Sequence, residues 1–508
     1  MNKNVLLALA FIIVLFSRLY FSFQTDNLSS DDSYFHLRQI ENIIDTGKPL
    51  FNDQLSYSGR EYVFAPLFHY IIAGISIFIP LDLTIKIIPS VLISICVFLF
   101  YLITKKITGD NHIALITGFF SGFIPIMYKE TINQLNPLSL LIPLILIIIN
   151  ALINIKEKKQ ITIYLITIII ASLTHPLISL LLIGILIYII TTFIDDIEQT
   201  KYERELILFS VFFILWTQFI IYKKMFLFHG INIIWQNIPK EIINEHFIRI
   251  SVIEAIYQIG ILQFIAGIYI VFRYFLKEKN KNIYLLTSFV ITIAISLWFK
   301  LIELKLGLII FGIMLTLLSA KGLKILLDFI ERTKLSRFNN FIFISIIFIL
   351  TITLVMPSII NAKAKINEIS KDEINAMNFI RDNTDVNSVI LASNEEGHLI
   401  TQVAKRKNII DGNFPLIKNI DKRYEDVKTI YKTTSLTEAI DLMDKYKITH
   451  LLLTSKIKNN FNIKTPDYLN ERKCFDSVSF GEIEIYIKKK SPYCKIKEIR
   501  IWNIILAK

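Results

Sequence analysis

Long uninterrupted runs of apolar residues dominate the chain from its N-terminus to about residue 360. A helix needs about 20 predominantly apolar residues to cross roughly 30 Å of hydrocarbon, and several runs reach that length. Of the 508 residues, 53% are hydrophobic and only 19% are charged, whereas charged residues make up about a quarter of ordinary globular chains. The runs do not alternate in polarity, which excludes a transmembrane β-barrel. The chain is therefore predicted to be an α-helical polytopic membrane protein.

The apolar runs predict about eleven transmembrane helices separated by short polar gaps. With a cytoplasmic N-terminus, 16 basic residues fall in the inner gaps and 10 in the outer segments between spans, counting Lys305 at a helix edge, which agrees with the positive-inside rule. This orientation places residues 24–82, 129–137, 223–250 and 299–303 on the outer face, together with the tail. The predicted helices cover residues 4–23, 83–104, 112–128, 138–155, 161–174, 177–194, 205–222, 251–275, 282–299, 303–320 and 340–360.

The formal net charge of +12 does not indicate binding to nucleic acid. Residues 361–508 carry 26 basic and 20 acidic residues, and the rest of the surplus lies in the membrane part. There it occupies short gaps between apolar runs, where basic residues set the topology. We expect no nucleic-acid partner.

Two domains are expected. Residues 1–360 form a membrane domain whose first exterior loop covers residues 24–82. The apolar stretch at 66–80 in this loop is too short to span a bilayer, so juxtamembrane helices are expected there. Residues 361–508 form an exterior soluble domain.

Short strand-like and helical runs alternate in residues 361–508. The strand-like runs extend from Ser388 to Leu391 and from Thr449 to Leu453, with a helical run between them. This alternation predicts a small α/β domain. Two cysteines, Cys474 and Cys494, lie in it, and two thiols leave a disulfide open without establishing one.

The segment after the first apolar run concentrates the polar chemistry of the chain. Residues 24–70 contain seven acidic residues and two histidines. A loop that only connects two helices needs a handful of residues, and this one has about sixty. Adjacent carboxylates at a membrane face can act as a general base, bind a divalent metal or pair with nearby basic residues. Composition alone leaves these three readings open.

The run from Asp32 to Arg38 resembles a motif in the first exterior loop of the oligosaccharyltransferase catalytic subunit, including the archaeal enzymes. The motif reads D-x-[YW]-[FY]-[NH]-x-R, and the chain has Asp-Ser-Tyr-Phe-His-Leu-Arg. The run from Asp53 to Arg60 is similar to a second motif of that family, D-x-x-x-W-Y-P-x-G-R. Together they resemble the GT-C superfamily of membrane glycosyltransferases, which use polyprenyl-phosphate-linked sugars.

The resemblance implies a role for each matching residue. Asp32 would be the catalytic carboxylate, and Asp31 would substitute for it or tune it. Tyr34 would form a wall of the pocket, and Arg38 would pair with the acidic loop. The expected substrate-binding residues of this loop are Tyr34, His36, Arg38 and Arg60.

Four further residues are candidates for substrate binding. Lys300 and Lys305 flank a short exterior turn, where a cation suits a lipid phosphate or pyrophosphate, although interfacial lysines also extend to the bilayer surface without a ligand. Glu254 ends a Ser-Val-Ile-Glu run that resembles the family's [ST]-[VI]-x-E element, but a capped helix start gives the same pattern. His175, which precedes Pro176, suits either a polar group near the substrate or a helix cap.

The second exterior loop departs from the family pattern. Oligosaccharyltransferases carry a second acidic motif there, which helps to hold a divalent cation. In this chain Asn136 stands where the carboxylate is expected, and Glu130 lies out of register. Asp32 and Glu130 remain candidate ligands for a magnesium or manganese ion, and Asn136 argues against that ion.

The exterior domain resembles the family in spacing but lacks its aromatic residues. The family motif W-W-D-x-G holds the Ser/Thr of a glycosylation sequon. Here the three motif residues become Ser393, Asn394 and Glu395, which supply no aromatic walls. We therefore expect a relative of oligosaccharyltransferases that does not transfer glycans to Asn-x-Ser/Thr in their way. The residues kept at the family spacing are Gly397, Arg406, Asp411 and Asn413.

The sequence thus predicts a GT-C glycosyltransferase of the cell membrane. It would transfer a sugar or glycan from a polyprenyl-phosphate-linked donor to a protein or glycan acceptor on the outer face, with Asp32 as the catalytic carboxylate. Two alternatives stay open: an oligosaccharyltransferase with altered acceptor recognition, and a non-catalytic or transport protein. Against a transporter, no charged residue recurs at mid-span depth.

Overall fold

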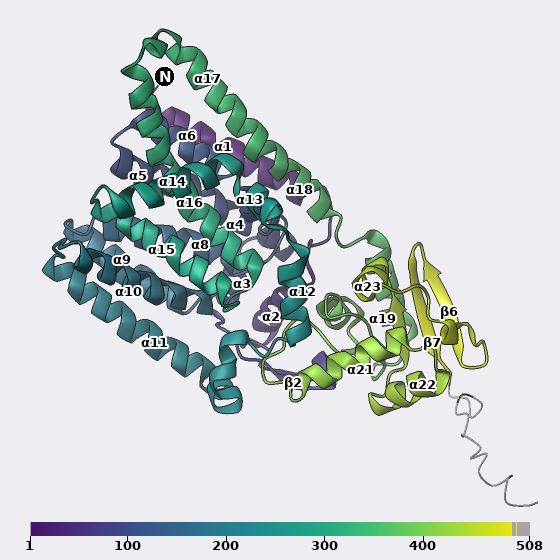
Figure 1. Cartoon of the computed structure of the whole chain (residues 1–508). Coiled ribbons are helices and arrows are strands. Elements are labelled where there is room, and N and C mark those ends of the chain that lie inside the picture. Colours follow the sequence, from purple (N-terminus) through teal and green to yellow (C-terminus); the bar gives the residue numbers. More distant parts are fainter. Residues whose placement is uncertain (1, 490–493, 495–508) are drawn as a thin grey trace, which may run out of the picture. The chain divides into compact units, whose positions relative to one another are not determined.

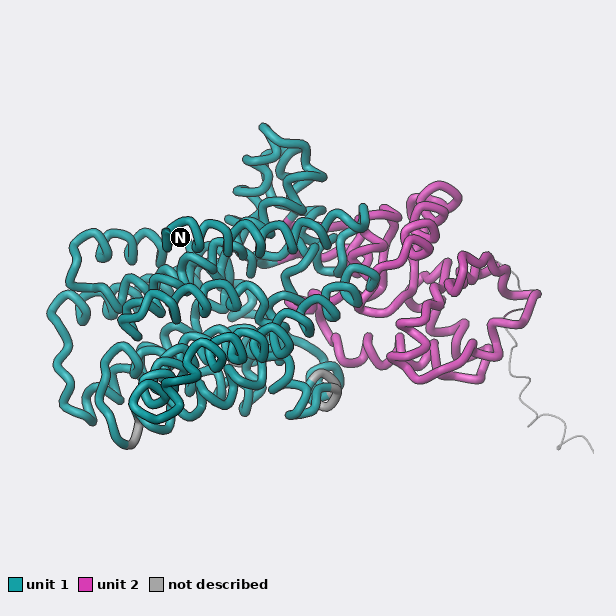
Figure 2. Tube along the Cα trace, turned by 90° about the horizontal axis from the view of Figure 1, so that it is seen from above, with its two compact units in different colours: residues 1–50, 63–368 teal, residues 51–62, 369–508 magenta. Residues whose placement is uncertain are grey.

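The computed structural model describes residues 2–489 and Cys494 (Figure 1). The chain forms two compact units, coloured separately in Figure 2. The first unit comprises Met1–Leu50 and Val63–Glu368, and the second comprises Phe51–Tyr62 and Ile369–Lys508. The short segment of residues 51–62, which we call the strap, therefore belongs to the second unit although it lies within the first exterior loop in sequence.

The first unit is almost entirely helical. Within the described residues, seven helical segments are long and apolar enough to cross a membrane, and a bent pair gives an eighth. The bent pair consists of α13 (Val252–Ile259) and α14 (Ile261–Leu276), which meet at 93°. The seven segments are α1 (Lys3–Ser22), α4–α5 (Leu81–Thr108), η2–α10 (Pro176–Ile194), α11 (Lys201–His229), α15 (Lys281–Trp298), α16 (Leu304–Glu331) and the apolar part of Lys334–Asn383, which contains α17 (Asn339–Leu350) and α18 (Met356–Ile366).

Fewer helices reach spanning length than the eleven predicted. Every predicted run is helical, but α6 (Asn111–Ser121), α8 (Leu138–Ile153) and α9 (Lys158–Ser172) have fewer than 18 residues each. At 1.5 Å per residue, the 16 residues of α8 extend only about 24 Å, less than the roughly 30 Å of a bilayer core. The predicted run at 112–128 is interrupted after Ser121, whereas α8 and α9 are about as long as the predicted runs, which were themselves short for a span.

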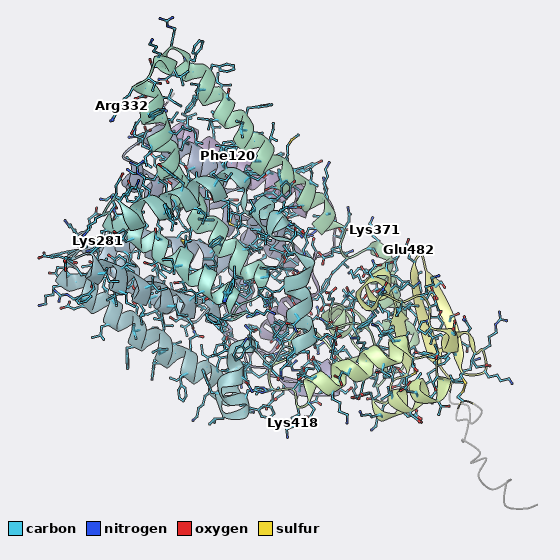
Figure 3. All side chains as sticks on the ribbon, in the orientation of Figure 1. Phe120, Lys281, Arg332, Lys371, Lys418 and Glu482 are labelled. Atoms are coloured by element: carbon cyan, nitrogen blue, oxygen red, sulfur yellow. A yellow bond between two sulfur atoms is a disulfide. The ribbon has the colours of Figure 1, made fainter. Side chains whose placement is uncertain are left out.

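Close helix packing holds the first unit together. Charged side chains such as Lys281 and Arg332 mark the ends of α15 and α16, and Phe120 of α6 is buried between helices (Figure 3). Helices α14 and α16 approach through Gly267, where an added Cβ would lie 2.9 Å from the carbonyl oxygen of Leu315. Interiors packed this densely resist deformation, so the turns that connect these helices are supported by a rigid helical bundle.

Two shorter helices lie between α1 and α4. Helix α2 (Asp31–Thr46) follows Ser30 and ends at Gly47, whose positive φ of 75° closes the last turn. Helix α3 (Leu67–Ile75) has nine residues, about 14 Å. This confirms a helix too short to span within residues 66–80.

The second unit contains a five-stranded mixed sheet, which confirms the predicted α/β domain. Strands β3 and β5 fall on the two predicted strand-like runs, and all their residues are buried. Strand β3 is parallel to β4 and β5, whereas β7 is antiparallel to β5 and β6. The strands, in spatial order, are β4 (Lys407–Asn408), β3 (Val389–Leu391), β5 (His450–Leu453), β7 (Ile483–Lys488) and β6 (Phe475–Phe480), and the main helices are α19 (Lys371–Asn383), α21 (Ile420–Lys432), α22 (Leu436–Lys445) and α23 (Ser455–Phe461).

A disulfide joins Cys474 and Cys494, which are 20 positions apart in sequence. The pairing that the sequence left open is thus formed in the second unit. Cys96, the third cysteine, is a buried free thiol in α5.

Candidate functional site

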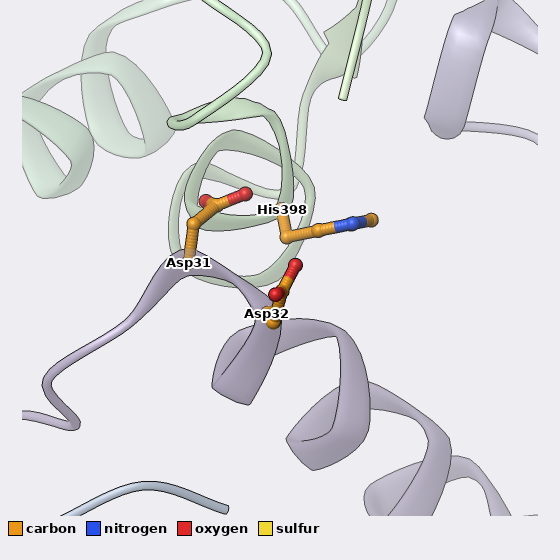
Figure 4. Close-up of side chains that lie close together, drawn as sticks. All are labelled: Asp31, Asp32 and His398. Carbon is orange, nitrogen blue, oxygen red and sulfur yellow. The ribbon is translucent and has the colours of Figure 1, made fainter. Parts of the chain in front are cut away.

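Asp31 and Asp32 lie in the first turn of α2 (Figure 4). The helix buries Ser33, Tyr34 and Phe35 against the first unit, which leaves Asp31 half-buried and Asp32 exposed. Two carboxylates at a helix N-terminus are stabilised by the helix dipole. Asp32 therefore presents a carboxyl group that a ligand can reach.

The second exterior loop is fastened beside the start of α2. Asn133, with a positive φ of 49°, donates through Nδ2 to Ser29 Oγ at 2.7 Å and to the Asn27 carbonyl at 2.8 Å. The Leu135 amide donates to Ser33 Oγ at 3.0 Å. These bonds bring the 129–137 loop to the two aspartates, as the predicted site requires.

Glu130 is the buried carboxylate of that loop. Burial alone would raise the pKa of Glu130, but the positive charges of Lys305, Lys365 and Lys129 outweigh it and hold the pKa below its usual range. Among the residues that the structure describes, its Oε1 has no hydrogen-bond partner. Asn136, which stands at the expected carboxylate position, instead accepts from the Leu138 amide, the first residue of α8, at 2.9 Å.

Glu303, directly before α16, is a further carboxylate of this region. Its side chain reaches solvent, yet protein surrounds it closely. Burial and the negative charge of Asp32 raise the pKa of Glu303, Glu130 adds to the rise, and Lys305 opposes it. Asp32, Glu130 and Lys305 are thus each near enough to Glu303 to influence its charge. Glu303 had no predicted role, although an acid between Lys300 and Lys305 in a short turn was a usable signal.

An open cavity adjoins this charged group. Lys300 borders it and donates through Nζ to Asn244 Oδ1 at 2.8 Å, and the same ammonium lies 5.5 Å from the centre of the Phe247 ring. Glu303 forms another part of the wall. The cavity therefore combines apolar surface, one cation and one carboxylate. Its lining residues are Ile234, Trp235, Gln236, Ile238, Ile243, Phe247, Lys300, Leu301, Ile302 and Glu303.

His36 is held by a second histidine. Its Nδ1 lies 2.9 Å from Nε2 of His69 on α3. Burial lowers the pKa of His69 to about 3, so that ring stays neutral at ordinary pH. Because His36 follows Asp32 by four positions, both lie on one side of α2. Arg38, two residues after His36 on the same helix, is half-buried.

His175 and Glu254 are found in capping arrangements. His175 Nδ1 accepts from the Leu177 amide at 3.1 Å, and burial lowers the pKa of this histidine to about 4. Glu254 is exposed in the first turn of α13, where its amide donates to Ser251 Oγ at 3.1 Å. Both positions match the capping alternatives raised by the sequence.

Arg60 belongs to the second unit, where its guanidinium is fully engaged. Nη1 lies 3.5 Å from Asp411 Oδ1 and also donates to the Asn413 carbonyl. Nη2 donates to the Pro415 carbonyl at 2.5 Å. The guanidinium carbon lies 4.3 Å from the centre of the Tyr62 ring. These contacts fasten the strap to the loop after β4.

Asp411 is the centre of this network. Ser56 of the strap donates through Oγ to Asp411 Oδ2 at 2.6 Å, and Asn408 Nδ2 donates to the same oxygen at 3.2 Å. The Asn413 amide donates to Oδ1 at 3.0 Å. A Cβ at Gly397 would lie 2.4 Å from the Asp411 Cβ, so only glycine fits there. The motif residues of the strap and the residues kept at the family spacing in the second unit thus form one hydrogen-bonded network.

The stretch that replaces the aromatic motif folds onto itself. Ser393 donates through Oγ to Glu396 Oε2 at 2.9 Å, and Thr454 donates to Oε1. Burial raises the pKa of Glu396. Glu395 is exposed and accepts from Asn460 at 3.1 Å. His398, labelled in Figure 4 on α20 (Gly397–Leu399), is buried with Nε2 3.8 Å from Asp411 Oδ1.

No protein-family profile matches the sequence, and neither does any curated protein. Solved structures do resemble it. The archaeal oligosaccharyltransferase AglB from Archaeoglobus fulgidus, in complex with an inhibitory peptide and a dolichol-phosphate, matches 94% of this chain with 74% of its own, at a TM-score of 0.65 and 13% identity. ArnT from Cupriavidus metallidurans, bound to undecaprenyl phosphate, matches 96% of this chain with 98% of its own, at a TM-score of 0.58 and 9% identity.

The arabinofuranosyltransferase AftD from Mycobacteria matches 97% of this chain with 40% of its own, at a TM-score of 0.58 and 11% identity. All three are GT-C membrane glycosyltransferases. At these identities the likeness concerns the fold, and it extends over nearly the whole chain. The chain has a GT-C fold.

Proposed function

We propose that this protein is an integral-membrane glycosyltransferase that transfers a sugar or glycan from a polyprenyl-phosphate-linked donor to an acceptor, with Asp32 as the catalytic carboxylate. The observation that supports it best is the group of Asp32, Glu130, Glu303 and Lys305, coupled through their charges, on a GT-C fold. The structural relatives include one in complex with a dolichol-phosphate and one bound to undecaprenyl phosphate, which supports the donor class.

In the proposed reaction, Asp32 accepts the proton of the acceptor nucleophile as that nucleophile forms a bond to the anomeric carbon. The bond from this carbon to the phosphate oxygen breaks, and the lipid phosphate leaves with the electron pair. Lys300 and Lys305 suit the stabilisation of that phosphate, because a cation near developing negative charge lowers the barrier. Attack opposite the leaving group inverts the anomeric carbon, as the resemblance leads us to expect.

A divalent cation fits two residues of the first unit. Glu130 keeps a buried carboxylate oxygen without a hydrogen-bond partner, and Asp32 is accessible. Magnesium is commonly held by one or two carboxylates together with substrate phosphates, so Asp32 and Glu130 are the residues that would hold it. The ion would supply Lewis-acid stabilisation of the leaving phosphate.

We place the reaction on the outer face of the cell membrane, with the N-terminus cytoplasmic. The excess of basic residues in the gaps assigned to the inside supports this orientation. A membrane-impermeant thiol reagent offers a direct check on intact cells. In a background with Cys96 replaced by serine, a cysteine introduced at Asp45 should be labelled. A cysteine introduced at Lys334 should be protected from the reagent.

A second candidate is an oligosaccharyltransferase with altered acceptor recognition. The higher TM-score with AglB than with ArnT favours it. The chain has no aromatic residue from Ser393 to Gly397, which argues against the family's acceptor pocket. Glycosylation of a peptide with an Asn-x-Thr sequon by the purified protein would support this candidate.

The test of the main proposal compares Asp32→Asn with Asp45→Asn, a change at an exposed acid near the other end of α2. Purified protein in liposomes receives polyprenyl-phosphate-linked hexoses with a tritiated sugar, and transfer to acceptors of each class is counted. Asp32→Asn should abolish transfer, and Asp45→Asn should leave it unchanged. Full activity of correctly inserted Asp32→Asn would refute the assignment.

A further inference from the structure

Arg18 is a fully buried cation in α1, four residues before that helix ends. Its guanidinium forms no ion pair in the described part of the chain, and its Nε and Nη1 atoms have no hydrogen-bond partner. Arginines buried to this extent are normally paired with an acid. The sequence analysis did not single out this residue, because one arginine near the end of a predicted span resembles a surface anchor.

The remaining nitrogen of Arg18 contacts the second exterior loop. Nη2 donates to the Thr131 carbonyl at 2.8 Å and to Thr131 Oγ1 at 2.7 Å. Thr131 Oγ1 in turn donates to the Met127 carbonyl at 2.5 Å. The guanidinium carbon lies 5.0 Å from the centre of the Tyr128 ring, whose hydroxyl donates to Ser17 Oγ at 3.2 Å. One side chain thus joins α1 to the point where the loop leaves α7 (Pro125–Lys129).

The neighbour of Thr131 in sequence is Glu130, the buried carboxylate of the candidate site. Asn133 fastens the far side of the same turn to Ser29 and Asn27. The loop is therefore held at two places, by Arg18 before the turn and by Asn133 after it. Glu130 lies on the side that Arg18 holds.

Stability does not explain a cation in this place. Removing a charge from water is costly, and buried charges are often replaced by apolar side chains of similar volume without loss of stability. A buried charge without an acidic partner is therefore better explained by a functional role. The hydrogen bonds from Arg18 to Thr131 indicate what that role is.

We propose that Arg18 is a positioning residue for the transfer reaction, which holds the second exterior loop so that Glu130 keeps its place beside Asp32 and Glu303. This inference rests on the proposed function. It names a residue outside the exterior loops and outside the motifs that carry the family resemblance.

The first test is Arg18→Met, which keeps the length of the side chain and removes its charge and donors. The control is Gln218→Leu. Gln218 of α11 is also buried, and it donates to the carbonyl of Ser172, the last residue of α9, at 2.8 Å. Hydrogen–deuterium exchange of the full-length protein in detergent is followed by mass spectrometry. Arg18→Met should exchange at least about tenfold faster in residues 129–137, with residues 299–303 unchanged.

Two further measurements separate positioning from general stabilisation. The melting temperature of Arg18→Met should equal or exceed that of the unaltered protein, while kcat for transfer from tritiated hexosyl polyprenyl phosphate falls at least about tenfold and KM stays within about twofold. Arg18→Lys should recover part of kcat. Thr131→Val should lower kcat similarly, and the double variant should be no worse than the poorer single variant.

Unchanged exchange in residues 129–137 would overturn the proposal, as would a fall in melting temperature that matches the loss of kcat. Gln218→Leu should change neither the loop exchange nor kcat. If the unaltered protein transfers none of the probe sugars, the proposed function fails. The exchange experiment would still decide whether Arg18 holds the loop.

Discussion

Arg60 and Asp411 form a buried ion pair, with Nη1 3.5 Å from Oδ1 and side-chain exposures of 2% and 0%. Arg60 lies in the strap, near the start of the chain, and Asp411 lies in the exterior domain. Their pairing makes the strap a structural part of the second unit. It also offers a structural reason for the motif-like run at residues 53–60, because Arg60 stabilises the fold of the second unit.

Loss of Arg60 should destabilise the second unit strongly. Arg60→Met leaves Asp411 buried without its charge partner, and removing one member of a buried pair costs about 3–5 kcal/mol. Urea denaturation, followed by exchange in peptides of the second unit, measures the loss. Arg381→Met, which breaks an exposed pair with Asp382, should cause no measurable change. Combining Arg60→Met with Asp411→Asn should recover part of the stability, and a double variant worse than Arg60→Met would contradict this account.

Gly397→Ala should have a similar local effect for a steric reason. Its Cβ would lie 2.3 Å from the Ile410 carbonyl oxygen and 2.4 Å from the Asp411 Cβ, so the backbone around Asp411 must move. Overpacking of this kind costs about 1–3 kcal/mol, visible as a lower melting temperature. Gly74→Ala in α3 meets no atom within 4 Å and should be neutral or slightly stabilising. Equal melting temperatures for the two variants would disprove the steric argument.

Glu396 should make the stability of the second unit depend on pH. Burial raises the pKa of Glu396 above its ordinary value of 4.5. Its contribution to stability is therefore complete below about pH 4.5 and is lost as pH rises through the higher folded-state value. Glu396→Gln cannot ionise, so its melting temperature should gain on that of the unaltered protein between pH 4.5 and pH 8. Glu395→Gln, at an exposed position, should follow the unaltered protein, and parallel curves for all three proteins would refute the prediction.

Glu303 should matter more for catalysis than Glu254. Glu303 is coupled to Asp32 through charge, whereas Glu254 is exposed at a capped helix start. A group that holds or moves a proton in a reaction contributes roughly 100-fold or more. Glu303→Gln should therefore reduce kcat for sugar transfer about 100-fold, and Glu254→Gln should change it less than about threefold. The opposite order would favour the role implied for Glu254 by the resemblance to oligosaccharyltransferases.

The Cys474–Cys494 disulfide should stabilise the second unit. Cross-linking residues 20 positions apart constrains the unfolded chain by about 3 kcal/mol in the chain-entropy account. A reductant should lower the melting temperature of the unaltered protein and have no effect on the Cys474→Ser, Cys494→Ser double variant. Thiol titration of denatured, unreduced protein should find one free thiol, that of Cys96, and three thiols would show that the bridge is absent.

The sequence was sufficient for features that depend on neighbours along the chain. Strands β3 and β5 and helix α22 lie where short apolar or amphipathic runs predicted them. The concentration of acidic residues at Asp31 and Asp32 was also visible in the sequence, although no helix was predicted to start there. His175 and Glu254 had capping alternatives for the same local reason.

Features that depend on distant residues were missed. Nothing near Arg60 indicates that its partner is Asp411, and nothing near Glu303 indicates that Asp32 lies close. Arg18 looked like an ordinary cation at the end of a span, because its partner Thr131 is on another loop. Fewer helices reach spanning length than predicted, because a hydropathy profile registers apolar runs even where, as at residues 161–174, they are shorter than a typical span.

The strap also sets the order in which parts of the protein can be completed during synthesis. Arg60 is made 353 residues before Asn413, whose carbonyl it binds. At about 5–20 residues per second, the ribosome needs roughly 20–70 s to cover that distance. Throughout this interval Ser56, Tyr57 and Arg60 have none of their exterior-domain partners. The first exterior loop is thus among the earliest segments translated and among the last to be finished, so an interrupted chain lacks a completed loop as well as the exterior domain.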